Sequence, residues 1–304
     1  MFIFSIILSL TILLSVNGEA YSMKHHRGGH HRHFKECPCG ESDFTEQRII
    51  NGKVVQDNRK YPWIVSILVS DHRVMRHWGF CGGALISPTF VLTAAHCFPK
   101  FQPVTCSKMP FMCEALKGKN ILVGFLGENK HQPAETVLVK RVIMHPRRKK
   151  GTPGTDIALL ELMHSISCTE YTKPICVKPP ENIIIPGKIM HVAGFGRTAI
   201  HNRSKELREG TSRIVDGSVC RSRFKKFLPS KELCAMANER TRVCVGDSGT
   251  SGFLEHKNKF YTVGVVSFGD DLCMLNKPAV FTKTGAYLDF IREHVKDLPK
   301  QPHG

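Results

Sequence analysis

The stretch Cys244-Val245-Gly246-Asp247-Ser248-Gly249-Thr250-Ser251 places an acid and a serine between two glycines. Glycine permits a tight turn that leaves a hydroxyl exposed and points backbone N–H groups outward. A nucleophilic serine is usually presented in this way. Gly, Asp and Ser also form ordinary turns, so the stretch indicates chemistry only if partner residues occur elsewhere in the chain.

The 304 residues around this stretch favour one large all-β domain preceded by leader segments. Short alternating or apolar runs are separated by Gly, Pro and polar turns, which is typical of a β-sandwich or β-barrel. Tyr287, Phe290, Ile291 and Val295 share one helical face and predict a terminal helix. We expect residues 299–304 to form a disordered tail. The strand-like runs lie at 63–69, 84–86, 137–143, 157–162 and 261–266.

The first 20 residues read as a signal peptide, because an apolar run is followed by Gly18 and Ala20 in small-x-small spacing. An uncleaved anchor is the alternative, since a positive n-region is missing, but no later stretch approaches membrane-spanning length, so we expect no stable membrane insertion. Residues 21–48 are polar and histidine-rich and predict a pro-segment. Its five clustered imidazoles could bind metal adventitiously or sense pH, but a solvated leader is the favoured interpretation. We therefore expect a secreted, extracellular protein.

The twelve cysteines support that compartment, because an even number behind a secretory leader predicts disulfides. Structural zinc is disfavoured, since no CxxC pair faces a second one and Cys37-Pro38-Cys39 is too cramped for a zinc half-site. We expect no metal site. Asn202 begins an Asn-Arg-Ser sequon in polar surroundings and predicts a glycosylated loop.

A net charge of +17 belongs to the part of the chain after Arg48. Such a surface favours anionic partners, namely acidic proteins, sulfated glycans or membrane surfaces. Nucleic acid is disfavoured, because no nucleic-acid-binding motif accompanies the charge in this secretory context.

Two further stretches supply partners for Ser248. His96 lies in Thr93-Ala94-Ala95-His96-Cys97, and Asp156 opens the apolar run Asp156-Ile157-Ala158-Leu159-Leu160. Each residue alone is more often structural, but the chain order His, Asp, Ser is that of a known Ser-His-Asp arrangement. Together they predict a catalytic triad.

The motifs TAAHC, DIALL, GDSG and the opening RIING resemble the chymotrypsin/trypsin family of serine proteases over residues 49–298. The resemblance implies an all-β fold of two perpendicular six-stranded antiparallel β-barrels with a C-terminal helix and the active site between them. It implies a monomer that hydrolyses protein substrates through an acyl-enzyme and needs no cofactor.

By the same resemblance, Ser248 is the nucleophile, His96 the general base and then acid, and Asp156 the group that orients His96. The N–H groups of Gly246 and Ser248 form the oxyanion hole, where one donor commonly contributes ~3–4 kcal/mol to the transition state.

Arg48-Ile49 matches the family's activation site, so the chain as written is a zymogen. Cleavage frees the Ile49 amine to pair with Asp247 and order the oxyanion loop. The family's usual bridges correspond to Cys81–Cys97, Cys220–Cys234 and Cys244–Cys273. One of Cys37 and Cys39 should pair with Cys176 and the other with Cys168, which leaves Cys106 and Cys113 to close an inserted loop.

Arg242 occupies the pocket-floor position that is Asp in trypsin-like members, with Ser267, Gly269 and Ala279 as pocket walls. A guanidinium there repels Arg or Lys and attracts a carboxylate. We therefore expect a preference for acidic residues, assisted by the basic run 147–150, and activation by a separate trypsin-like protease. The alternatives are that Arg242 folds aside and leaves an apolar pocket, and that the basic run is only a solvated loop.

Thr250 and Ser251 stand where the family usually has Gly and Pro. If position 250 requires a conformation that only glycine adopts, Thr250 strains the turn and weakens catalysis. The alternative function is then a weakly active or inactive protease homologue that binds anionic partners through its basic surface.

Overall fold

A computed structural model describes residues 37–43, 54–71, 76–98, 121–129, 132–148, 152–197, 204–238, 246–270, 274 and 276–302. Several predictions concern positions outside these ranges and are not tested by the structure. They are the signal peptide, Arg48, Ile49, Asn202, Arg242, and the pairs Cys244–Cys273 and Cys106–Cys113.

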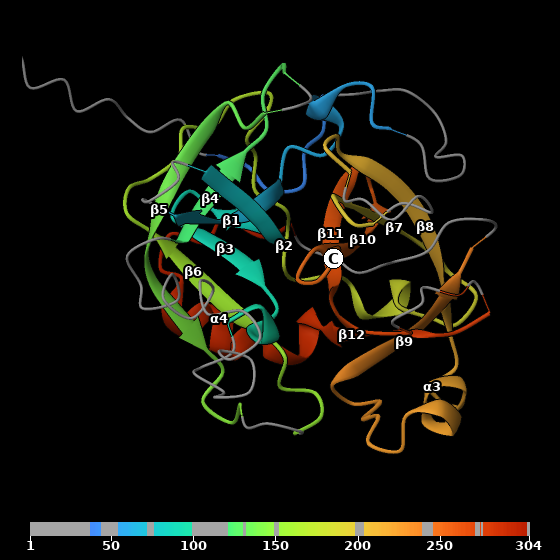
Figure 1. The fold of residues 1–304 in the computed structure, drawn as a ribbon. Coiled ribbons are helices and arrows are strands. Elements are labelled where there is room, and N and C mark those ends of the chain that lie inside the picture. Colours follow the sequence, from blue (N-terminus) through green and yellow to red (C-terminus); the bar gives the residue numbers. More distant parts are fainter. Residues whose placement is uncertain are drawn as a thin grey trace, which may run out of the picture. The chain divides into compact units, whose positions relative to one another are not determined.

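The described chain folds into two closed antiparallel β-barrels of six strands each, which confirms the predicted all-β class (Figure 1). The first barrel has the strand order β1-β2-β3-β6-β5-β4 and the second β10-β11-β12-β9-β8-β7. Both barrels thus follow the same order when each is counted from its own first strand. The strands are β1 Ile64–Asp71, β2 Arg76–Ser87, β3 Phe90–Thr93, β4 Ile121–Phe125, β5 Glu135–Met144, β6 Ala158–Leu162, β7 Ile189–Gly194, β8 Arg208–Val215, β9 Glu232–Ala237, β10 Ser251–His256, β11 Lys259–Phe268 and β12 Ala279–Lys283.

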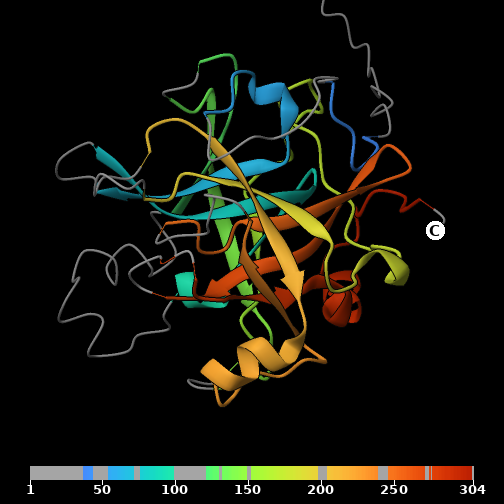
Figure 2. The same cartoon turned by 90° about the vertical axis from the view of Figure 1, so that its right-hand side faces the viewer.

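Short helices lie between the strands of these barrels and after the last strand (Figure 2). The predicted terminal helix is α4, Leu288–His294, which follows the 3-10 turn η4, Thr284–Tyr287, and buries Phe290 and Ile291. The helix α3, Gly217–Arg223, was not predicted, because Cys220 is its one buried residue and the segment therefore carries no apolar stripe. Its start is fixed instead by Asp216, whose side chain accepts a hydrogen bond from the Ser218 N–H. The remaining 3-10 turns are η1 Asn58–Lys60, η2 Ala95–Cys97 and η3 Glu181–Ile183.

Aromatic side chains pack the two barrels against each other. Trp63, just before β1, lies edge-on to Phe253 of β10 at 5.3 Å between ring centroids, and Tyr61 does the same at 5.1 Å. All three side chains are buried. Burial of such a side chain contributes about 1.5–3 kcal/mol, and an aromatic pair adds about 0.5–1.5 kcal/mol. These buried aromatic contacts therefore fix the position of one barrel relative to the other.

Residues 37–43, which precede the expected activation site, are bound to the barrels. Disulfides join Cys37 to Cys168 and Cys39 to Cys176, which decides the pairing that the sequence left open. Gly40 accepts from the Phe260 N–H, and its positive φ of 73° lets the backbone approach that strand. The remaining described bridges are Cys81–Cys97 and Cys220–Cys234, as predicted.

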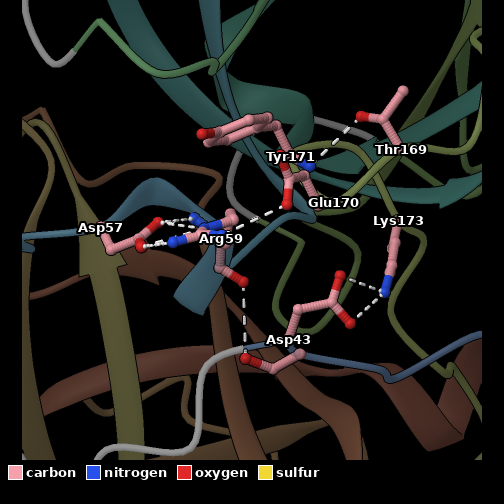
Figure 3. Close-up of polar contacts among 8 residues, drawn as sticks. Asp43, Asp57, Arg59, Thr169, Glu170, Tyr171 and Lys173 are labelled. Carbon is pink, nitrogen blue, oxygen red and sulfur yellow. Dashed lines mark hydrogen bonds and ion pairs between the residues drawn. The ribbon is translucent and has the colours of Figure 1, made fainter.

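Ion pairs lie on the outside of the same region. Lys173 contacts Asp43 at 2.6 Å, and Arg59 lies between Asp57 and Glu170 (Figure 3). The tail 299–304, which we expected to be disordered, is described to residue 302, and the Gln301 side chain accepts from the N–H groups of Val177 and Lys178. None of the helices in the described part of the chain is long and apolar enough to span a membrane.

Candidate active site

His96 sits at the edge of the first barrel, in the single turn η2 that follows β3. The next residue, Cys97, is bonded to Cys81 of β2, and the Thr93 hydroxyl donates to the Gly82 carbonyl at 2.8 Å. These bonds leave the short turn little freedom. The imidazole side chain is 33% exposed, so one side of it faces solvent where a substrate can approach.

Asp156 faces His96 from the segment that leads into β6. Its Oδ2 lies 2.7 Å from His96 Nδ1, and its Oδ1 accepts the backbone N–H of His96 at 2.8 Å. Asp156 is 7% exposed. Two bonds to the same residue fix the direction of the imidazole ring, which is what an orienting acid must do.

Two other groups complete the surroundings of the Asp156 carboxylate. The Ser267 hydroxyl of β11 donates to Oδ2 at 2.5 Å, and Arg148 Nη2 lies 3.4 Å from Oδ1. Burial by itself would raise the pKa of Asp156, but the hydrogen bond and charge of His96, with Arg148 and Ser267, outweigh it and hold the pKa below the ordinary value. The carboxylate therefore stays ionised despite its burial.

The backbone around Asp156 is held by the second barrel. The Thr282 hydroxyl of β12 donates to the Asp156 carbonyl at 2.9 Å, and Glu232 Oε1 of β9 accepts the Gly154 N–H at 2.8 Å. Thr282 and Glu232 are cross-strand partners in the β9–β12 ladder. One cross-strand pair of the second barrel thus binds the chain around Asp156 at two residues, Gly154 and Asp156.

Ser248 lies in the turn before β10, and its backbone carbonyl contacts β2 and the residue after His96. Its carbonyl accepts the Gly82 N–H at 2.9 Å and lies 3.8 Å from Cys97 Sγ, the residue after His96. Gly249 has φ +81°, and a Cβ there would collide with the Thr93 hydroxyl and the Gly82 carbonyl. Gly246 also has a positive φ, +104°. The backbone around Ser248 therefore requires glycine at both positions.

Asp247 contacts the segment at the end of β7. Its Oδ1 accepts the Gly196 N–H at 2.8 Å, and a Cβ on Gly194 or Gly196 would collide with the carboxylate. Glycines at both positions leave room for a charged group inside the body of the protein. The expected partner of Asp247, Ile49, lies outside the described residues.

The predicted pocket walls divide into two groups. A Cβ built on Gly269 would lie 3.5 Å from the Cβ of Ala279, so these two small residues lie next to each other. Ser267, also predicted as a wall, has its hydroxyl on Asp156 and belongs with the acid. Beside Ser267, Phe268 is 41% exposed and lies edge-on to Phe224.

Thr250 adopts a conformation open to any residue. In the described part of the chain, the non-glycine residues with positive φ are Lys257 and Asn258, so Thr250 has no left-handed strain. Its side chain is fully buried and donates to the Ala193 carbonyl at 2.6 Å. The condition under which Thr250 would strain the turn is not met.

Candidate metal ligands come together at one place in the described residues, where Cys81, His96 and Cys97 lie close to one another. Both sulfurs belong to the Cys81–Cys97 disulfide. A disulfide sulfur is not a thiolate ligand, so a single imidazole is left. This group therefore does not form a metal centre.

Sequence analysis did not identify three residues that contact the acid's segment: Arg148, Glu232 and Thr282. Arg148 was visible only as one member of a basic run, and nothing in the run distinguishes it from Arg147. Strand register brings Glu232 to Gly154 and Thr282 to Asp156, and the sequence carries no local signal for that register.

The fold of two closed six-stranded antiparallel barrels is that of the chymotrypsin/trypsin class of serine proteases. Residues 49–291 match the family model described as Trypsin, and the chain belongs to this family. Over 266 residues it is 29% identical to a tryptase of Mus musculus, with 83% of this chain and 90% of the relative covered. It is also 27% identical over 265 residues to the suppressor of tumorigenicity 14 protein homolog of Bos taurus, where 84% of this chain corresponds to 29% of the relative's length.

Proposed function

We propose that this chain is a secreted serine endopeptidase, synthesised as a zymogen, that hydrolyses peptide bonds of protein substrates through Ser248, His96 and Asp156. The 2.7 Å contact between His96 Nδ1 and Asp156 Oδ2 carries the proposal, because it orients the imidazole and leaves its Nε2 available to a serine. The 3.8 Å separation between the Ser248 carbonyl and Cys97 Sγ, in the Cys81–Cys97 bridge, supports Ser248 as that serine.

The reaction follows from these positions. His96 Nε2 takes the proton from the Ser248 hydroxyl while the oxygen attacks the scissile carbonyl carbon. The tetrahedral oxyanion is stabilised by the N–H groups of Gly246 and Ser248. His96 then gives the proton to the leaving amine, and the acyl-enzyme is hydrolysed by a water that His96 activates in the same way. Asp156 stays ionised and stabilises the imidazolium at both steps.

Activation requires cleavage between Arg48 and Ile49. The new Ile49 amine enters the body and pairs with Asp247, which orders the oxyanion loop. The glycines at 194 and 196 around the Asp247 carboxylate support this step, since they leave room for a buried charge pair. The bridges Cys37–Cys168 and Cys39–Cys176 keep the cleaved pro-segment attached.

Arg242 in the pocket directs the enzyme to acidic side chains. A desolvated contact between like charges costs several kcal/mol, which excludes Arg and Lys, while a carboxylate gains a partner. Gly269 and Ala279 support this preference, since neither supplies an acid that neutralises the guanidinium. Because Arg48 does not suit such a pocket, a separate trypsin-like protease performs the activation.

The apolar leader and the disulfides support secretion. Asn202 then carries a glycan, the chain acts as a monomer, and the basic surface attracts acidic proteins or anionic glycans. The unstrained Thr250 supports catalysis over an inactive binding protein, because the turn that carries Ser248 is not distorted at that position.

Covalent labelling tests the proposal. The purified zymogen is cleaved at Arg48 by added trypsin, checked by N-terminal sequencing, and treated with a fluorophosphonate probe. We expect labelling of the cleaved parent and none of Ser248→Ala or of uncleaved Arg48→Ala. Absence of label on protein with a verified Ile49 terminus contradicts the protease function.

A peptide set that differs at the residue before the scissile bond tests the pocket separately. We expect the fastest hydrolysis after Asp or Glu. Faster cleavage after Lys, Arg or Phe contradicts the role of Arg242 without affecting the labelling result.

A further inference from the structure

The turn that carries Ser248 is closed by Thr250. The Thr250 N–H donates to the Asp247 carbonyl at 3.0 Å, which makes residues 247–250 a β-turn with Ser248 and Gly249 at its centre. The positive φ of Gly249, 81°, is the conformation that a type II turn requires at its third position. The position of the candidate nucleophile therefore depends on what holds this turn.

Backbone atoms attach the turn to two strands. On the β11 side, the Gly249 N–H donates to the Val266 carbonyl at 2.9 Å, and the Val266 N–H donates to the Thr250 carbonyl at 2.9 Å. On the β2 side, the Gly82 N–H donates to the Ser248 carbonyl, also at 2.9 Å. Every residue offers a main-chain carbonyl, so neither attachment depends on the side chain at position 250.

A third attachment, to β7, does depend on that side chain. The Thr250 hydroxyl donates to the Ala193 carbonyl at 2.6 Å. β7 pairs with β10, the strand that follows the turn (Figure 1). Thr250 and Ala193 are both buried, so water does not replace the hydroxyl when it is removed. Glycine, which the family usually has at this position, offers no side-chain donor.

Two residues near Ser248 in the chain reach the same segment at the end of β7. Asp247 accepts the Gly196 N–H at 2.8 Å, and Thr250 binds Ala193. The Asp247 carboxylate is the group that gains a partner in the proposed activation step. The Thr250 hydroxyl carries no charge, and its bond requires no new chain terminus.

We propose that Thr250 is a positioning residue whose hydroxyl attaches the Ser248 turn to β7 and thereby holds the nucleophile where His96 can take its proton. This inference rests on the proposed function. Loss of the hydroxyl leaves the turn attached to β2 and β11, so the chain still folds, but the serine also adopts unproductive positions. A displacement of about 1 Å can lower an enzyme's rate about 100-fold, so a small loss of restraint affects turnover strongly.

The test compares Thr250→Val, which keeps the shape and removes the hydroxyl, with Thr250→Ser, which keeps the hydroxyl. Thr172→Val is the matched control, because the buried Thr172 hydroxyl also donates to a backbone carbonyl, that of Ser167 at 2.7 Å. Each full-length protein is cleaved at Arg48 by added trypsin. Both kcat and KM are then measured for one peptide that the parent hydrolyses, and urea unfolding checks that each variant is folded.

We expect kcat of Thr250→Val to fall about tenfold or more while KM stays within about twofold, because the substrate still binds but meets a misplaced serine. Thr250→Ser should keep kcat within about threefold of the parent. Thr172→Val should match the parent in kcat, although its urea midpoint also falls. Equal kcat in Thr250→Val and the parent overturns the proposal. An equal loss in Thr172→Val, or a Thr250→Ser variant as slow as Thr250→Val, overturns it as well.

Hydrogen exchange gives a second measurement that does not require activity. Mass spectrometry follows the backbone N–H groups of Gly249 and Thr250, whose bonds hold the turn, before and after cleavage at Arg48. We expect Thr250→Val to raise their exchange rate about tenfold in both forms, and Thr172→Val to leave it unchanged. An unchanged rate in Thr250→Val overturns the role of Thr250. If the cleaved parent is inactive and Thr250→Val still exchanges faster, the attachment of the turn by Thr250 is supported and the protease function is contradicted.

Discussion

Two clusters of carboxylates in this protein have contacts of similar length and very different surroundings. In the buried cluster, His96 Nδ1 lies 2.7 Å from Asp156, whose side chain is 10% exposed. In the outer cluster, Arg59 lies 2.5 Å from Asp57 and 3.3 Å from Glu170, with side chains of 40% and 49% exposure for Arg59 and Glu170 (Figure 3).

We infer from this difference that burial, more than distance, decides how much such a contact contributes to stability. Water already solvates the outer charges, so their pairing changes little. At Asp156 each donor replaces water that cannot return, so removing one leaves a charge or a dipole without a partner. The predictions below test this contrast in order of decreasing effect.

The largest effect is expected from Asp156→Asn. The amide fits the same space but lacks the charge that stabilises the His96 imidazolium, and it disfavours the required tautomer. We expect kcat to fall about 10⁴-fold. The measurement is single-turnover hydrolysis by activated enzyme, with Ser248→Ala as the baseline. A loss of less than tenfold would mean that Asp156 is not the orienting acid.

The next effect concerns the pKa of a partly buried histidine, His191. The His191 ring of β7 stacks on Phe253, and its Nδ1 is buried without a hydrogen-bond partner among the described residues. Burial, followed by the charge of Lys60, lowers the His191 pKa to about 4. His191 in the unfolded chain therefore binds a proton below the ordinary histidine pKa of about 6.5, whereas His191 in the folded protein stays neutral until the pH is near 4.

Stability should consequently fall as the pH drops from 7 to 4. The unfolded state binds more protons than the folded state in this range, and the His191 contribution amounts to about 3 kcal/mol of unfolding free energy. We expect His191→Phe to remove that part of the pH dependence in urea unfolding at pH 7, 5.5 and 4.5. The exposed His164→Gln serves as control, and parallel curves for His191→Phe and the parent would contradict the prediction.

Features of the fold and of the candidate site could be predicted from the sequence where they depend on residues within one short segment. Alternating runs and turn residues predicted the all-β class, the family resemblance predicted the two barrels, and the spacing within GDSG fixes the two positive-φ glycines around Ser248. His96 and Cys97 are adjacent in the chain, so the Cys81–Cys97 disulfide restrains the positions of both residues. These features depend on neighbours within a few residues.

Contacts could not be predicted from the sequence where they join residues that lie far apart in the chain. Ser267 reads as a pocket wall, yet its hydroxyl reaches Asp156, 111 residues away. Thr282 and Glu232 hold the Asp156 segment because the β9–β12 register puts them opposite each other. Arg148 differs from Arg147 only through the direction of a turn. A sequence pattern carries none of these pairings.

An intermediate effect is expected from Glu232→Gln. Both oxygens of this buried carboxylate accept backbone N–H groups, from Gly154 at 2.8 Å and Leu228 at 2.7 Å. An amide retains one acceptor and places its NH₂ against a donor, which costs about 2 kcal/mol of unfolding free energy. Urea unfolding measures this loss, with the exposed Glu255→Gln as control. Equal midpoints for the two variants would contradict the role of Glu232.

The smallest effect is expected from Arg59→Gln in the outer cluster. Arg59 makes several short contacts, with Asp57 on one side and Glu170 on the other, and the hydrogen bond with Asp57 raises its pKa further. Both partners of the longer pair remain solvated, so water replaces the guanidinium when it is removed. We expect the urea midpoint and kcat/KM to match those of the parent within error, at low and at high salt. A loss as large as that of Glu232→Gln would show that distance, and not burial, governs the contribution of these contacts.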